Sequence, residues 1–213
     1  MDIKSALSKS ALPFILIIAG LVTSLAHAND DKQPTLLVLG DSLSAGYGFD
    51  ASKGWVELLQ QRITKEHLAY RVVNGSVSGN TTGDGLTRLP ALIKRHQPAI
   101  IIIALGANDG LRGYSIKSMQ KNLVTIIKKS RESGARTLIT HMEIPPNYGR
   151  RYTEQFKNSF ATIAAQENVN TLPFFLYQLV SNPQLMLDDG IHPNAKAQDL
   201  ILETLWPSIR ELL

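Results

Sequence analysis

The stretch "AIIIIAL", from Ala99 to Leu105, constrains the fold of this chain more than any other feature. It is apolar at every position, whereas a strand with one side in water would alternate apolar and polar residues. A short, isoleucine-rich run of this kind is typical of a central strand in a parallel sheet that is covered on both faces. The chain must therefore supply helices for both sides of such a sheet.

The rest of the chain alternates apolar runs with amphipathic stretches that can provide this cover. Strands are expected at Thr35–Leu39, Tyr70–Asn74, Ala99–Leu105, Thr137–His141 and Thr171–Phe174. Helices are expected at about Trp55–Glu66, Gly85–His96, Met119–Ser130, Thr153–Gln166 and Ala195–Leu212. Pro207 predicts a kink or break in the last helix. The alternation predicts an α/β fold: a doubly wound, mostly parallel sheet in a single-domain, three-layer α/β/α sandwich.

The first 28 residues have the pattern of a secretory signal peptide. Lys4 and Lys9 provide a positive segment, residues 12–25 are mostly apolar, and Ala26-His27-Ala28 is a small-x-small cleavage pattern. The apolar core is shorter than the roughly 20 residues that a membrane span prefers, which disfavours an uncleaved anchor. We expect cleavage after Ala28, a mature domain over residues 29–213, and a periplasmic or secreted location.

Composition excludes several classes of function. The chain has no cysteine, which removes thiol nucleophiles and thiolate metal sites. Without residues 1–28 it has 20 basic and 17 acidic side chains and no basic stripe, so nucleic acid is not an expected partner. No H-E-x-x-H pattern occurs, which disfavours a metal hydrolase.

Polar, glycine-rich stretches follow the expected strands. Asp41-Ser42 follows the first strand, "NGSVSGNTTG" (74–83) the second and "GANDG" (106–110) the third, while "DDGIHPN" (188–194) comes after the fifth. Because a site in such a sheet lies beyond the carboxyl ends of its strands, we expect these stretches to meet there.

Together these stretches contain the groups that nucleophilic catalysis requires. Ser42 is the candidate nucleophile, His192 is the base that would take its proton, and Asp189 would orient the imidazole. The Ser42 N–H, the Gly79 N–H and the Asn108 amide are candidate donors to a tetrahedral oxyanion. These complementary roles, distributed over separate loops, favour a serine hydrolase over coincidence.

Each of these residues also has a structural alternative when it is taken alone. Such alternatives are a helix cap at Ser42, Asp188 or Asp189, a turn at Gly79, an Asx-turn at Asn108 and an ordinary loop histidine at His192. The other histidines are weaker candidates for the base. His67 and His96 are expected at helix ends, and His141 has no acid at a suitable spacing.

The stretches that hold these residues resemble the motifs of a known family. "GDSLS" (40–44), Gly79, "GAND" (106–109) and "DGIHP" (189–193) are similar to the four blocks of the SGNH/GDSL hydrolases. The longer strings "GDSLSAGYG", "LGANDGLRG", "NYGRRY" and "LDDGIHPN" resemble the periplasmic thioesterase I subgroup, whose members are also called lysophospholipase or arylesterase. The resemblance implies a flavodoxin-like, five-stranded parallel sheet of order 2-1-3-4-5 and no cofactor or metal. It also implies cleavage of acyl esters and thioesters through an acyl-enzyme on Ser42.

Several finer expectations follow. The substrate is expected to be a small-molecule acyl ester or thioester, with transient contact with lipid, and the protein to be a monomer. In the loop "GLRGYS" (110–115), Leu111 and Tyr114 are expected to contact the acyl chain, and its glycines would let the loop close. Asp41 is expected to be structural, accepting backbone N–H bonds.

Two other functions remain open at this stage. A carbohydrate O-acetylesterase would use the same triad, although the chain has no additional carbohydrate-binding module. A non-enzymatic flavodoxin-like protein could hold phosphate in the loop 75–83, but it would leave His192 and Asp189 unexplained.

Overall fold

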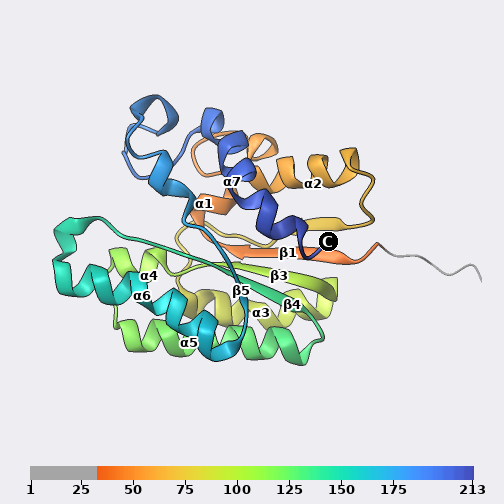
Figure 1. The fold of residues 1–213 in the computed structure, drawn as a ribbon, viewed down its shortest axis with the longest axis horizontal. Coiled ribbons are helices and arrows are strands. Elements are labelled where there is room, and N and C mark those ends of the chain that lie inside the picture. The colour runs from red at the N-terminus through yellow and green to blue at the C-terminus, as the bar shows by residue number, and fades with distance from the viewer. Residues whose placement is uncertain (1–32) are drawn as a thin grey trace, which may run out of the picture. The chain divides into compact units, whose positions relative to one another are not determined.

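Five parallel strands form one sheet in the computed structural model, which describes residues 33–213. The strands are β1 (Thr35–Gly40), β2 (Arg71–Asn74), β3 (Pro98–Ala104), β4 (Arg136–Thr140) and β5 (Asn170–Leu172). Their order is β2-β1-β3-β4-β5, as expected from the sequence (Figure 1). The expected signal peptide lies outside the described residues.

The two central strands have the burial that their sequences predict. Every residue of β1 is buried, and Ala99 is the only residue of β3 that is not. The two strands pair from Leu36 opposite Ile100 to Gly40 opposite Ala104, so their carboxyl ends lie level. The edge strands β2 and β5 are shorter and partly exposed, because only one side of each is covered by a neighbouring strand.

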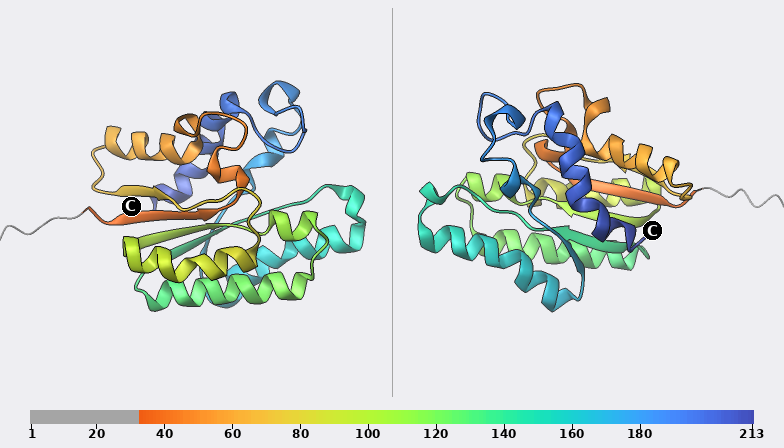
Figure 2. Two further views of the ribbon diagram at one scale, coloured as in Figure 1. Left: turned by 180° about the vertical axis from the view of Figure 1, so that it is seen from behind. Right: turned by 45° about the horizontal axis from the view of Figure 1, so that its top comes forward.

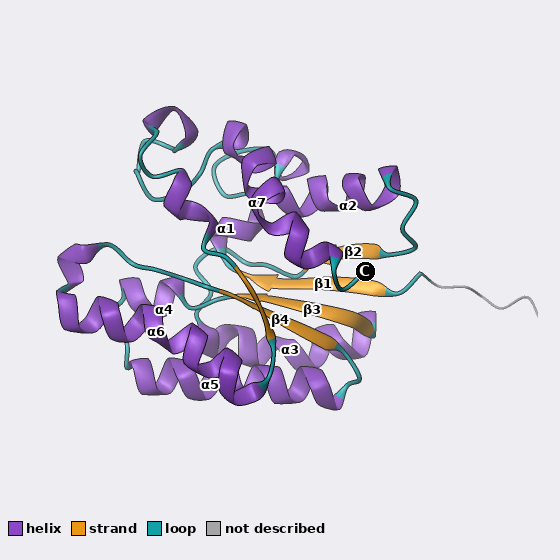
Figure 3. Ribbon diagram, in the orientation of Figure 1, coloured by secondary structure: helices purple, strands orange, loops and turns teal. Residues whose placement is uncertain are grey.

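Helices cover both faces of the sheet. They are α1 (Ser42–Ala45), α2 (Trp55–Lys65), α3 (Thr82–His96), α4 (Ala107–Leu111), α5 (Ile116–Glu132), α6 (Arg150–Glu167) and α7 (Gln198–Arg210). Figures 1 and 2 show α2 and α7 over one face and α3, α5 and α6 over the other. Figure 3 shows the same three layers by secondary structure, which confirms the α/β/α sandwich.

The structure differs from the sequence predictions mainly at helix ends. α3 begins at Thr82 rather than near Gly85, because Thr81 and Asp84 form a reciprocal capping box. α7 begins at Gln198, after a 3₁₀ turn at Ala195–Ala197. The helix continues through Pro207 to Arg210, so the predicted break is absent.

Two short helices were not anticipated at all. α1 and α4 follow β1 and β3 directly, and each contains a candidate site residue, Ser42 and Asn108 respectively. Among residues 33–213, no helix has both the length and the apolar character that crossing a membrane requires.

Candidate active site

Ser42 lies where β1 ends and α1 begins. The Asp41 carboxylate accepts a hydrogen bond from the Leu43 N–H at 3.1 Å and caps the helix, and Gly46 ends it one turn later in the left-handed region, with φ of 78°. Gly40 has to be small, because a Cβ there would lie 2.8 Å from the Ser76 Oγ and 2.9 Å from the Ser44 Oγ. This tight turn holds the Ser42 side chain at the carboxyl edge of the sheet.

His192 contacts Ser42 across 150 positions of sequence. Its Nε2 lies 2.9 Å from the Ser42 Oγ, and its Nδ1 lies 2.7 Å from Oδ2 of Asp189. Asp188 is exposed, and Asp189 is the carboxylate that bonds the imidazole. The structure therefore joins the three residues predicted as a triad in the order that general-base activation of a serine requires.

The turn around Asp189 keeps its carboxylate ionised. Desolvation would raise the Asp189 pKa, but hydrogen bonds from the His192 N–H, the Ile191 N–H and the imidazole outweigh it and lower the pKa to about 2. Both backbone N–H groups donate to Oδ1 at 2.9 Å. A carboxylate that stays charged can stabilise the imidazolium formed during catalysis.

Tyr47 packs against this histidine. The two ring centroids are 4.5 Å apart with a tilt of 44° between the planes. Tyr47 follows α1 in the chain, so one short segment contains both Ser42 and an aromatic contact for His192. Sequence reasoning missed Tyr47, although "GDSLSAGYG" includes it.

The three predicted oxyanion donors come from three adjacent strand ends. Within residues 33–213, the Ser42 N–H and the Gly79 N–H donate to no protein acceptor, which leaves both available to a ligand. The Asn108 amide donates to the Asn80 carbonyl at 3.0 Å and more weakly to Oδ2 of Asp41 at 3.4 Å. The longer of these two bonds is the one that a developing oxyanion would replace or share.

Asp41 is completely buried beside these donors. Desolvation by this burial raises its pKa from 3.8 to about 6, although the Leu43 N–H, the charge of His192 and the Asn108 amide act in the opposite direction. The Leu43 bond agrees with the expectation that Asp41 accepts a backbone N–H, and it makes Asp41 the N-cap of α1. Its contact with Asn108 adds a connection that sequence reasoning missed.

Arg112 connects the loop 110–115 to the turn that contains Gly79. Its Nη2 donates to the Gly79 carbonyl at 2.9 Å, and Gly79 itself has a φ of 79°. A second connection comes from Asp109, whose buried carboxylate accepts bonds from the Thr82 N–H and hydroxyl at 2.8 and 2.7 Å. The turns after β2 and β3 are thus fixed to each other by two side chains, Asp109 and Arg112, that follow Asn108 in the chain.

His141 does not compete with His192 as the base. It follows β4, its ring lies 6.4 Å from that of Phe160, and desolvation lowers its pKa. The ring that contacts Ser42 belongs to His192.

The comparison with known families agrees with this geometry. Residues 38–200 match the GDSL-like Lipase/Acylhydrolase family. The chain belongs to this family. The resemblance predicted from the four sequence blocks, and the hydrolase class with it, are confirmed.

Individual members of the GDSL-like family are similar to this chain over most of their length. Esterase TesA of Pseudomonas aeruginosa is 44% identical over 93% of this chain and 98% of its own. An arylesterase of Vibrio mimicus is 45% identical over 79% of this chain and 84% of its own. Thioesterase 1/protease 1/lysophospholipase L1 of Escherichia coli is 42% identical over 95% and 93%.

Solved structures of GDSL-like hydrolases share the fold. The crystal structure of TesA superposes with a TM-score of 0.81 at 48% identity, covering 84% of this chain and 99% of that one. The structure of the psychrotrophic esterase EstA from Pseudoalteromonas sp., inhibited by monoethylphosphonate, also has a TM-score of 0.81. It is 43% identical and covers 84% of this chain and 97% of that one. The predicted fold class is confirmed.

In this GDSL-like hydrolase, the loop with the predicted acyl contacts Leu111 and Tyr114 is held by two tyrosines. The Tyr148 hydroxyl donates to the Leu111 carbonyl, and the Tyr152 hydroxyl to the Tyr114 carbonyl, both at 2.8 Å. The Tyr114 side chain is 49% exposed, so it is open to a ligand. Both tyrosines belong to "NYGRRY", a string that the sequence singles out without assigning it a role.

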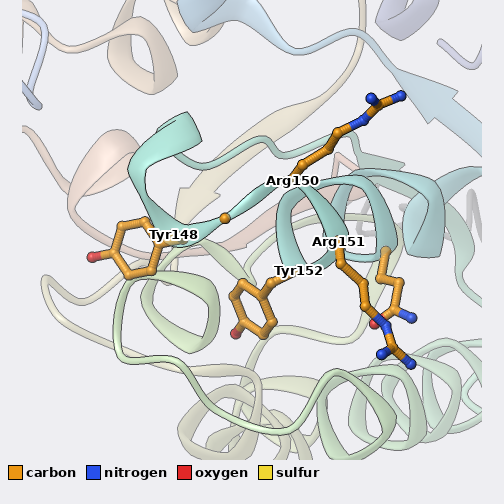
Figure 4. A pocket seen from close by; sticks show the side chains of 6 residues that line it. Tyr148, Arg150, Arg151 and Tyr152 are labelled. Atoms are coloured by element: carbon orange, nitrogen blue, oxygen red, sulfur yellow. The ribbon is translucent and has the colours of Figure 1, made fainter.

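A hollow of about 390 Å³ lies at the same place, lined by residues 148–152 and Gln155. Figure 4 shows the Arg150 and Arg151 side chains extending from the start of α6 in different directions. Arg150 is also paired with Glu154 at 2.7 Å. The two guanidinium groups therefore do not converge on a single anion.

Proposed function

We propose that this protein hydrolyses small-molecule acyl esters and thioesters through an acyl-enzyme on Ser42. The observation that carries this proposal is the continuous series Asp189–His192–Ser42, in which the contacts are 2.7 and 2.9 Å long. With it come the N–H groups of Ser42 and Gly79, which donate to no acceptor within residues 33–213. The names of the relatives, esterase, arylesterase and thioesterase/lysophospholipase, support this substrate class.

The first half of the reaction forms the acyl-enzyme. The Ser42 Oγ attacks the carbonyl carbon while His192 Nε2 takes its proton, and Asp189 stabilises the resulting imidazolium. The carbonyl oxygen becomes an oxyanion that accepts bonds from the Ser42 N–H, the Gly79 N–H and the Asn108 amide. The tetrahedral intermediate collapses, and His192 gives its proton to the leaving alkoxide or thiolate, which departs as the alcohol or thiol.

The second half returns the enzyme to its starting state. Water takes the place of the leaving group, and His192 removes one of its protons as it attacks the acyl carbon. The same donors stabilise the second oxyanion, and the acid leaves as Ser42 regains its proton from His192.

Replacement of Ser42 with alanine tests this proposal. Ser42→Ala should abolish turnover of p-nitrophenyl esters, acyl-CoA and lysophospholipid, and also covalent labelling by an organophosphonate, with an unchanged thermal melt. Ser78→Ala, which changes the residue next to Gly79, is the matched control and should keep both activities. Phosphonate attached to Ser76 or Ser78 would refute the assignment.

We also propose that the enzyme is exported after cleavage following Ala28, acts as a monomer and contacts lipid transiently. The signal-like pattern of residues 1–28 supports export. N-terminal sequencing of protein from an exporting host should give Asn29 as the first residue, and an intact Met1 would reject this part. Sedimentation of the purified protein tests the monomer.

A further inference from the structure

The exposed apolar side chains of this protein are concentrated at one edge. Eight large apolar or aromatic side chains are exposed in residues 33–213. Seven of them follow the carboxyl end of a strand, and we call them the apolar rim: Tyr47, Val77, Tyr114, Tyr148, Tyr177, Val180 and Ile191. The eighth, Leu200, lies on α7. Scattered exposed apolar residues need no explanation, but a concentration at one edge indicates an interaction surface.

Three members of the apolar rim lie beside the catalytic groups. Tyr47 packs on the imidazole, Ile191 precedes His192, and the Val77 N–H donates to the Gly40 carbonyl at 3.1 Å, next to the nucleophile turn. These three members of the apolar rim therefore lie in segments that adjoin Ser42 or His192.

The other members follow β3, β4 and β5 at the same edge of the sheet. Tyr114 belongs to the loop 110–115 and Tyr148 bonds it. Tyr177 and Val180 follow β5 and are 71% and 58% exposed, the two largest exposures in the rim. Their apolar surface has no protein cover in the described part of the chain.

The composition of the apolar rim indicates what kind of surface it meets. Four of its seven members are tyrosines, which combine an apolar ring with a polar tip and favour the boundary between lipid and water. Arg112 and Arg151 lie at the same edge, and within residues 33–213 neither pairs with a carboxylate. Guanidinium groups bind phosphate well, so the edge can contact both the chains and the headgroups of a phospholipid.

We propose that the apolar rim docks on the surface of aggregated phospholipid or lysophospholipid, from which an acyl substrate enters the site directly. This inference rests on the proposed function, because it concerns the opening of the same site. The opposite edge of the sheet has no exposed large apolar residue in its described loops, so docking has one orientation.

Vesicle binding in the Ser42→Ala background tests docking without turnover. Vesicles of equal parts phosphatidylethanolamine and phosphatidylglycerol should carry the variant upward in a flotation gradient. Adding Tyr177→Ser and Val180→Ser should weaken binding about tenfold, because two exposed apolar side chains are lost from the contact. Leu200→Ser in the same background is the matched control and should bind as before.

Kinetics separate this inference from the proposed function. With Ser42 present, the Tyr177→Ser/Val180→Ser enzyme should keep its kcat/KM on soluble p-nitrophenyl acetate and lose most of its advantage on lysophospholipid above the aggregation concentration. Absent vesicle binding, or equal loss in the Leu200→Ser control, would overturn docking while leaving ester hydrolysis intact. A concentration-dependent dimer that the double variant abolishes, without vesicle binding, would overturn it in favour of a second copy of this chain.

Discussion

The proposed acid–base side and the proposed oxyanion side of the site each contain an aspartate, and the two carboxylates lie in opposite environments. Asp189 is on an exposed turn and accepts bonds from two backbone N–H groups and the imidazole, so that its pKa falls to about 2. Asp41 is fully buried with one backbone bond of 3.1 Å and one amide contact of 3.4 Å, and its pKa rises to about 6.

This difference shows how charge is distributed in the site. A carboxylate with enough donors stays ionised and can stabilise a cation formed during the reaction. A carboxylate that is buried with few donors holds its proton to a higher pH and serves mainly as a structural acceptor. Four experiments, in order of decreasing effect, test this contrast and the role of the loop 110–115.

The largest expected effect is at Asp189. Asp189→Asn should lower kcat about 10⁴-fold, because a neutral amide neither stabilises the imidazolium nor selects the correct tautomer of His192. Steady-state kinetics on p-nitrophenyl acetate measures this. Asp188→Asn is the control and should change kcat little. If Asp188→Asn were the more damaging variant, the orienting role would belong to Asp188.

The next largest effect is expected at Asn108. Asn108→Ala should lower kcat about 10²–10³-fold with little change in KM, because the lost bond belongs to the transition state. Asn108→Asp should be at least as harmful, since it places a second carboxylate beside Asp41. Kinetics and a thermal melt on one preparation distinguish a catalytic role of Asn108 from a structural one. Normal kcat per folded molecule with a lower Tm would remove Asn108 from the oxyanion site.

Asp41 should control how stability depends on pH. Its pKa of about 6 in the folded protein lies above the ordinary value of 3.8, so between these pH values the folded protein holds more protons than the unfolded chain. Stability should therefore fall as pH rises from 4 to 6, by up to about 3 kcal/mol. The contribution of Asp189 to stability depends on pH in the opposite direction, because its lowered pKa gives stability that is lost only as pH falls below about 4.

Urea unfolding of the wild type and Asp41→Asn between pH 4 and 7 measures this contribution. The free energy of unfolding should fall less with rising pH in the variant, whatever its absolute stability. Parallel curves would show that the buried Asp41 carboxyl does not titrate in this range. The kcat of Asp41→Asn should remain well above that of Asp189→Asn.

The smallest effect is expected in the loop 110–115. Tyr148→Phe combined with Tyr152→Phe removes the two hydroxyls that bond this loop and should change the preference among acyl chain lengths about fivefold, with a smaller change on an acetyl ester. Tyr70→Phe is the control, because its hydroxyl bonds Arg136 at the other end of the sheet. An unchanged chain-length profile would mean that the loop does not contact the acyl chain.

Gly113 is a poor position for stiffening this loop. Its φ is 64°, whereas proline fixes φ near −65°, so Gly113→Pro would distort the turn instead of making it rigid. Only the backbone angle in the structure reveals this, since the sequence indicates no more than the presence of a glycine.

Much of the fold and of the site could be predicted from the sequence. The five strands and the five long helices follow from local periodicity, and the errors are confined to their ends, as at Thr82 and Gln198. Ser42, Gly79, Asn108, Asp189 and His192 could be grouped because they follow the expected strands, whose carboxyl ends share one edge. The short helices α1 and α4 were missed because four or five residues are too few to establish a period.

The sequence by itself determined the layered architecture and the set of groups that meet at one edge of the sheet. Both follow from apolar periodicity and strand direction, which can be read locally and which dictate how the elements pack. Only the tertiary structure decided how those groups act on one another. The contact of Asp41 with Asn108, the bond from Arg112 to Gly79 and the packing of Tyr47 on His192 join residues 33 to 145 positions apart. Such contacts depend on the paths of irregular loops, which have no repeating pattern, so their geometry and the pKa values that follow from it appear only once the chain is folded.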